Sequence, residues 1–109
     1  MSDVKGESVY HKTKDYCIHA IRPCRTDNKK IMGEAKLNLT EPLTIHEMRI
    51  LLGRKFKKVQ YAPHIRAARI DWKGKVIILF DSGEIYVREA DNERDILETV
   101  QVIDKALKI

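Results

Sequence analysis

The run Val76–Phe80, with the sequence VIILF, constrains the fold of this chain more than any other segment. An unbroken apolar run of this length, bounded by turn residues, is typical of a buried strand. The turn residues Asp81-Ser82-Gly83 follow, and the segment 84–88, EIYVR, then alternates between apolar and polar side chains. A β-rich run, a glycine turn and an alternating run together predict a β-hairpin.

This hairpin is the second part of a predicted three-stranded meander that spans Ile65–Glu89. Another turn, Trp72-Lys73-Gly74-Lys75, precedes the apolar run, and we expect Ile65–Asp71 to form the first strand. Because both turns are tight, consecutive strands of the meander should pair as antiparallel neighbours.

The middle strand of the meander is apolar on both of its faces. If Ile77 and Leu79 face a helical layer, then Val76, Ile78 and Phe80 emerge on the opposite face. A strand of this kind has its second face covered or uses it for binding. A homodimer partner, the N-terminal segment and a ligand are the alternatives for that face.

Two further strands and two helices are predicted around the meander. We expect a short strand at Tyr16–Ile21, a half-buried strand at Ile31–Leu39, one helix at about Ile45–Arg54 and a second at about Glu93–Leu107. The first helix begins with the capping-box pattern T-x-x-E at residues 44–47. The second has apolar residues at positions 96, 100, 103 and 107, which indicates an amphipathic helix lying on a sheet.

This order of elements predicts an α+β fold with two layers, an antiparallel sheet covered on one face by two helices. A length of 109 residues fits one domain, which we place at residues 14–109 after a flexible tail at 1–13. No segment approaches the roughly 18 apolar residues of a membrane span. The polar opening MSDVKGES lacks the apolar core of a secretory signal. We therefore expect a cytoplasmic protein with no membrane contact.

Positive charge is concentrated just after the first predicted helix. The chain has 21 Lys and Arg against 16 Asp and Glu, a formal net charge of +5, which permits attraction to nucleic acid. The densest cationic cluster is Arg54, Lys55, Lys57 and Lys58 around Phe56. Such a cluster is either a solvated helix end, where cations suit the helix dipole, or an anion-binding surface.

Residues 31–107 also resemble one half-repeat of the TATA-box-binding protein family. The local matches are Tyr61-Ala62-Pro63 before the meander, the segment 78–86 at the hairpin, and residues 90–106 in the last helix. The half-repeat of that family has a strand, a helix, an antiparallel meander and a long C-terminal helix. The resemblance implies a curved sheet whose uncovered face contacts nucleic acid, as the saddle of the family contacts a widened minor groove.

The residues on this face depart from the family pattern. Phe80 occupies a position that resembles one of the family's DNA-kinking phenylalanines, while the position resembling the other, near Arg66, has no aromatic residue. Tyr86 and Arg88 stand where the family tends to have small apolar or hydroxyl residues. These departures argue against TATA recognition. They leave Arg66, Ile78, Phe80, Tyr86 and Arg88 as candidate binding residues for another nucleic acid or a protein partner.

Cys17, His19 and Cys24 are candidate metal ligands because zinc prefers cysteine and histidine. In a strand, Cys17, His19 and Ile21 would share one face. Residues 15–24 also have a similarity to the edge of iron–sulfur domains, although two cysteines cannot supply four thiolates, so a cluster would need a partner or a second copy. We expect no cofactor, with zinc or an iron–sulfur cluster as the alternative.

The sequence favours a small non-enzymatic binding module, because no catalytic Ser/His/Asp or Cys/His arrangement and no phosphate-binding glycine motif stands out. The curved sheet face or the basic cluster would contact nucleic acid or a protein partner. Two alternatives stay open: an accessory domain of an iron–sulfur or metal-linked redox system that uses Cys17 and Cys24, and a structural homodimerisation module.

Overall fold

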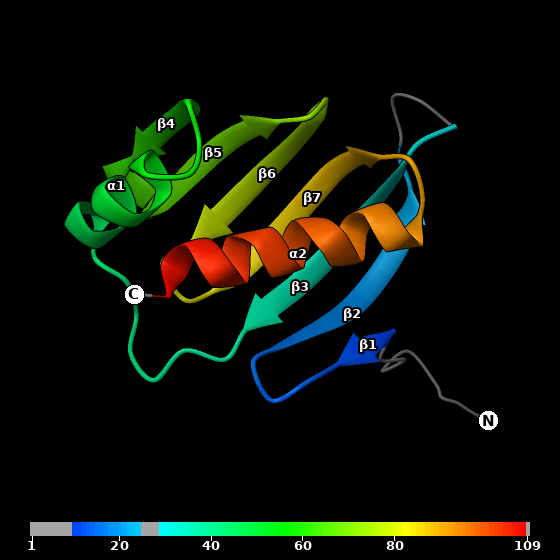
Figure 1. Cartoon of the computed structure of the whole chain (residues 1–109), viewed down its shortest axis with the longest axis horizontal. Helices are drawn as coiled ribbons and strands as arrows, with labels where there is room; N and C mark the ends of the chain where they lie inside the picture. Colours follow the sequence, from blue (N-terminus) through cyan, green and yellow to red (C-terminus); the bar gives the residue numbers. More distant parts are fainter. Residues whose placement is uncertain (1–9, 25–28, 109) are drawn as a thin grey trace.

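One antiparallel sheet carries the fold, and the strands of the predicted meander lie within it (Figure 1). A computed structural model of the protein describes residues 10–24 and 29–108. The strands follow the spatial order β1-β2-β3-β7-β6-β5-β4, and each pairs antiparallel with its neighbours. Their bounds are β1 His11–Lys12, β2 Tyr16–Pro23, β3 Ile31–Leu37, β4 Lys58–Ala62, β5 Ala67–Trp72, β6 Lys75–Phe80 and β7 Glu84–Ala90.

Two α-helices cover one face of this sheet, as the α+β prediction requires. Helix α1 spans Ile45–Gly53 and lies beside β4, and helix α2 spans Glu93–Leu107 and crosses β3 and β7 (Figure 1). A 3-10 turn, Pro63–Ile65, joins β4 to β5. Within the described part of the chain, neither helix combines the length and apolarity needed to cross a bilayer.

The helix starts follow the local chemistry of the sequence. Thr44 and Glu47 form the predicted capping box: the Thr44 hydroxyl accepts from the Glu47 amide at 3.0 Å, and the Glu47 carboxylate accepts from the Thr44 amide at 2.9 Å. At α2, the Asn92 side chain accepts from the Asp95 amide at 2.8 Å. The bounds predicted for α2 are confirmed, and α1 ends one residue before the predicted Arg54.

The meander forms because its two turns supply the backbone conformations that tight hairpins need. Lys73 and Gly74 both have positive φ, 50° and 76°, as in the two-residue turn that matches strand twist. Gly83 has φ 98° in the turn between β6 and β7. As predicted, Ile77 and Leu79 are fully buried under the helices, while the side chains of β6 on the other face are only partly buried.

The core lies between the sheet and the two helices. Its sheet side includes Ile70, Ile85 and Val87 in addition to the buried residues of β6. Its helix side is the apolar stripes of α1 and α2, at Met48, Leu51 and Leu52 and at Ile96, Val100 and Ile103. A sheet with one face sealed in this way leaves its other face, hereafter the outer face, to solvent or to a partner.

Two strands were not predicted. Residues 58–62 form β4, the edge strand beyond β5, in a segment for which no element was predicted. Strand β1 lies at the other edge and pairs with β2 through His11↔Ile18 and Lys12↔Cys17. The paired part of the chain therefore begins before residue 14, where we placed the domain boundary; residues 1–9 of the predicted tail lie outside the described residues.

The predicted faces of β2 are wrong after His19. A β-bulge lies between Ile18 and Ala20, so that residues on either side of His19 pair with consecutive residues of β3. The extra residue reverses the alternation. Ile21 therefore packs against the core instead of sharing a face with Cys17, and the strand continues to Pro23 instead of ending at Ile21.

The tight contact at Gly83 supports a stability prediction. Replacement Gly83→Ala would place a Cβ 2.9 Å from the Leu37 carbonyl oxygen at a residue with positive φ. We expect a loss of about 1–3 kcal/mol in the free energy of unfolding. Denaturant unfolding measures it, and Gly53→Ala is the matched control because its Cβ meets no atom within 4 Å. A Gly83→Ala protein as stable as the Gly53→Ala protein would contradict this description of the turn.

Candidate functional site

A hollow of about 650 Å³ lies where the segment after α1 meets the β5–β6 hairpin. Five lysines line it together with one tryptophan: Lys55, Lys57, Lys58, Lys73, Lys75 and Trp72. We call it the lysine hollow. Three of these lysines belong to the basic cluster predicted from the sequence, and the other two come from a hairpin more than ten residues further along the chain.

Phe56 fixes the first wall of the lysine hollow. Its backbone N–H donates to the Leu52 carbonyl at 2.8 Å, which closes the end of α1. Its buried ring packs edge-on against Trp72, with ring centroids 5.9 Å apart and an interplanar angle of 87°. Because the Phe56 ring is buried, the neighbouring Lys55 and Lys57 side chains lie exposed at the rim of the hollow.

Trp72 fixes the second wall by holding two cations. The Lys73 Nζ lies 4.8 Å from the centroid of the indole ring, and the Lys75 Nζ lies 5.0 Å from it. Both distances are within the range of cation–π attraction. The tight turn at Lys73-Gly74 brings these two lysines to the same ring.

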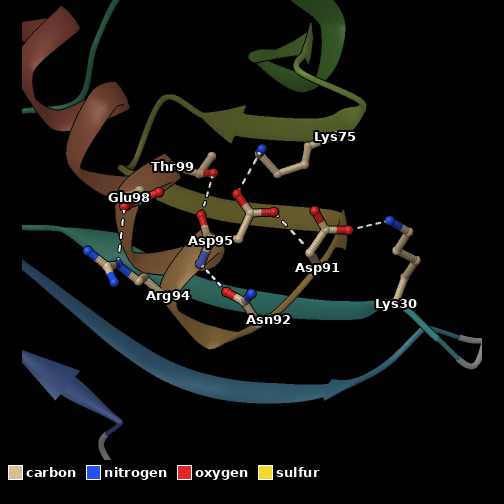
Figure 2. A network of polar contacts seen from close by, with 8 residues as sticks. All are labelled: Lys30, Lys75, Asp91, Asn92, Arg94, Asp95, Glu98 and Thr99. Carbon is tan, nitrogen blue, oxygen red and sulfur yellow. Dashed lines mark hydrogen bonds and ion pairs between the residues drawn. The ribbon is translucent and has the colours of Figure 1, made fainter.

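Lys75 is held by a polar network at the start of α2 (Figure 2). Its Nζ forms an ion pair with the Asp95 Oδ1 at 2.9 Å, and the residue is only 5% exposed. The other oxygen of Asp95 accepts from the Asp91 amide at 3.0 Å, and Asp91 in turn pairs with Lys30. Lys75 therefore stabilises the packing of the hairpin on α2, and the other four lysines carry the positive charge that faces solvent.

The positive charge of those four lysines is not balanced by ion pairs within the described part of the chain. Lys55, Lys57, Lys58 and Lys73 are exposed and make no ion pair with any residue in 10–24 or 29–108. Asp71 also lines the hollow, but its carboxylate pairs with Arg69 at 3.4 Å. The hollow is therefore a concave, net cationic surface, which is the kind of surface that attracts polyanions.

Arg54 and Arg66, two cations predicted to belong to binding sites, lie apart from the lysine hollow. Arg54 caps the end of α1 and does not line the lysine hollow. Arg66 follows the 3-10 turn with a left-handed backbone, φ 54°, and its guanidinium pairs with Asp81 at 3.7 Å. That ion pair spans the start of β5 and the end of β6, so Arg66 has a structural contact at the position where the resemblance lacked an aromatic residue.

A second hollow, of about 440 Å³, lies on the outer face of the sheet. It brings together four of the predicted binding residues, Ile78, Phe80, Tyr86 and Arg88, with Cys24 and Met32. The rings of Phe80 and Tyr86 pack edge-to-face, with centroids 5.8 Å apart. We call this the aromatic hollow. Arg88 is exposed and makes no ion pair with the described residues, so the hollow has an apolar floor and a cationic rim.

The three candidate metal ligands do not gather at one place: Cys24 lies at the opposite end of β2 from Cys17 and His19. Cys17 lies near the start of the strand, His19 is exposed at the bulge, and Cys24 is buried past its end, where its Sγ accepts from the Glu89 amide at 3.4 Å. The two cysteines are seven positions apart along extended chain, a distance of roughly 23 Å. Among the described residues, no three His, Cys, Asp or Glu side chains gather as metal ligands do. A metal shared with a second molecule stays a prediction.

Trp72, Lys73 and Lys75 are the residues of the lysine hollow that sequence reasoning missed. Residues 72–75, WKGK, were interpreted as turn chemistry alone. The sequence did contain a signal for this positive charge. The two-residue turn contains one lysine, Lys73, and a second lysine, Lys75, follows it directly, so this end of the hairpin must carry positive charge. Their position beside the basic cluster depends on strand β4, which was not predicted.

No protein-family model, curated protein or solved structure matches this chain. The candidate sites therefore rest on the chain's own geometry.

The Lys75–Asp95 ion pair leads to a prediction about pH. Burial raises the pKa of Asp95, but the hydrogen bond from the Asp91 amide and the ion pair with Lys75 outweigh burial and leave that pKa below its ordinary value. A carboxyl with a lowered folded-state pKa contributes stability above its unfolded pKa of about 3.8–3.9, and this contribution is lost as pH falls through the folded value.

We expect Asp95→Asn to cost about 1–3 kcal/mol of unfolding free energy at pH 7 and less at a pH well below 3.8, where the carboxyl becomes protonated in the folded protein. Urea unfolding between these pH values measures the difference. Lys75→Met and the double variant complete a cycle that isolates the pair. The same cost for Asp95→Asn at both pH values would show that the carboxylate charge does not stabilise the fold.

Proposed function

We propose that this protein is a small non-enzymatic module that binds nucleic acid through phosphate contacts in the lysine hollow. The observation that carries the proposal is the convergence of four lysines, from two separate segments, around one concave surface whose one lining carboxylate, Asp71, pairs with Arg69. The four are Lys55, Lys57, Lys58 and Lys73. Phosphate groups follow one another closely along a nucleic-acid strand, so several phosphates can occupy such a surface at once.

Lysine is suited to binding phosphate, but it gives little discrimination between nucleic-acid sequences. An ammonium group is a compact charge on a flexible stem, and it binds phosphate without the fixed two-point geometry of arginine. Contacts to phosphate position a nucleic acid but do not distinguish bases. Trp72 has Lys73 and Lys75 over its ring, so it serves here to position cations. We therefore expect binding with little sequence preference.

We also propose that the chain is related in fold to the half-repeat of the TATA-box-binding protein family. The order of elements from β3 to α2 supports this proposal: a strand, a helix, an antiparallel run of strands and a long C-terminal helix. The hairpin β1–β2 adds strands before that order begins. The functional proposal does not depend on this relation, because the lysine hollow lies at the sheet corner beside α1.

The aromatic hollow favours a second candidate function, binding of a protein partner on the outer face. Its partly buried Phe80, Tyr86 and Ile78 form an apolar centre, and Arg88 lies at the rim. Aromatic residues and arginine are the side chains that most often dominate protein interfaces. Replacement of Phe80 by serine would remove this centre without changing the net charge.

The salt dependence of binding tests the nucleic-acid proposal. Trp72 is the chain's one tryptophan, so its fluorescence reports directly on the lysine hollow. With four phosphate contacts, the logarithm of the affinity for duplex DNA should fall with a slope of about −3.6 against the logarithm of salt concentration. The variant Lys57→Gln/Lys73→Gln should reduce this slope by about 1.8 and weaken binding of unrelated sequences equally.

Lys12→Gln/Lys14→Gln is the matched control, because it removes the same charge at the opposite edge of the sheet. We expect it and Phe80→Ser to retain the original slope. An equal loss in both double variants would mean that only net charge matters. No binding of duplex or single-stranded DNA or RNA at low salt would end the proposal.

A further inference from the structure

The outer side of strand β4 is an open edge of the sheet. The sheet order ends at β4, and among the described residues no strand pairs with its outer side. This edge has five residues, no proline and no bulge in its pairing with β5. Open edges present unpaired N–H and C=O groups that can pair with another strand.

The register of the sheet determines which backbone groups of β4 are open. The Asp81 amide donates to the Arg66 carbonyl at 2.9 Å, which makes Arg66 and Asp81 a hydrogen-bonded pair of the β5–β6 ladder. Hydrogen-bonded and non-bonded pairs alternate along an antiparallel ladder. Residues 68, 70 and 72 of β5 therefore bond to β6, and residues 67, 69 and 71 bond to β4.

The partners of those three residues in β4 are Ala62, Gln60 and Lys58. Their N–H and C=O groups point inward, to β5. The N–H and C=O groups of Val59 and Tyr61 consequently point outward, so that the open edge offers two donors and two acceptors. Pro63, which follows the strand, has no N–H to add.

We propose that a second copy of this chain pairs with β4 in antiparallel register about a two-fold axis at Gln60. In this register, Val59 of one copy lies opposite Tyr61 of the second copy, and the reverse pair forms by symmetry. All four open groups of each copy are then hydrogen-bonded across the interface. This surface shares Lys58 with the lysine hollow, but the proposal does not depend on nucleic-acid binding.

Other antiparallel registers satisfy fewer constraints. A shift that places Tyr61 opposite Tyr61 of the second copy sets Val59 against Pro63, which lacks an N–H. A shift in the other direction, about Val59, sets Tyr61 against Lys57 and draws the basic segments of the two copies together. The register about Gln60 places each Lys58 opposite an alanine, Ala62 of the second copy, so no like charges face each other.

The side chains also suit this register. Val59 and Tyr61 lie on the core side of the sheet, partly buried and packed against the core. Arg49 holds the Tyr61 ring, with its guanidinium carbon 4.7 Å from the ring centroid. The second copy would place an aliphatic side chain against an aromatic one at both ends of the strand pair, a favourable cross-strand combination.

Sedimentation equilibrium without nucleic acid, at moderate salt, tests the proposal. We expect the mass to rise with concentration from 12.7 kDa toward twice that value. In the proposed dimer, Gln60→Glu places two carboxylates opposite each other at the central pair, where the side chains are close. In each monomer, the new carboxylate lies across from Arg69, so the monomer itself gains no like-charge contact in the β4–β5 pair. We expect Gln60→Glu to raise the dimer dissociation constant about fivefold or more.

Gln101→Glu is the matched control, because it makes the same chemical change on α2, away from the β4 edge, and it should leave the dissociation constant unchanged. Gln101 donates to the Tyr16 hydroxyl at 3.1 Å, and the new carboxylate can instead accept from that hydroxyl. Amide exchange gives an independent measurement: Val59 and Tyr61 should gain protection with concentration, while Lys58 and Gln60 are protected throughout. A monomer at millimolar concentration, or a dimer without this protection pattern, would overturn the proposal. Loss of DNA binding in the lysine variants would not affect this outcome.

Discussion

The close packing of Ile96 on Gly33 allows α2 to seal one face of the sheet. A Cβ at residue 33 would lie 2.8 Å from the Ile96 side chain, so only glycine permits this approach of helix and strand. Once Ile96 is seated, Val100 and Ile103 follow at helical spacing over the buried side of the sheet. One turn of α2 therefore sets the distance between the layers for the whole helix.

The same end of α2 positions the candidate site. Asp95, one residue before Ile96, holds Lys75 at 2.9 Å, and Lys75 begins β6 at the hairpin that lines the lysine hollow. The position of that hairpin is therefore coupled to the packing of α2. Because both helices lie on the sealed face, they leave the outer face, the sheet corner and the β4 edge uncovered. Each proposal made above uses one of these three.

The elements that could be predicted from the sequence are those with local signals. The capping box at Thr44, the glycine turns and the apolar stripe of α2 each fix an element through residues that are close in sequence. Strand β4, KVQYA, alternates polar and apolar side chains over four residues only, directly after a basic cluster. This pattern is too short to fix a strand without the pairing with β5 that supplies its stability. The bulge at His19 likewise depends on the partner strand and not on β2 alone.

The lysine hollow was predicted only in part, since Lys73 approaches the basic cluster through the unpredicted pairing of β4 with β5.

The lysine hollow and the β4 edge share Lys58, yet salt should act on them in opposite directions. In the proposed register the Lys58 residues of two copies lie four residues apart along the strands, roughly 14 Å. The Debye length is about 8 Å at physiological ionic strength and about 30 Å at 0.01 M, so repulsion between the two clusters is screened in the first case and not in the second. Low salt therefore opposes pairing of the chains, whereas it strengthens phosphate binding by favouring counterion release. A nucleic acid that neutralises Lys58 would remove the same repulsion. We therefore expect nucleic acid to favour pairing of two copies at low salt concentration, where the salt does not screen the lysine charges.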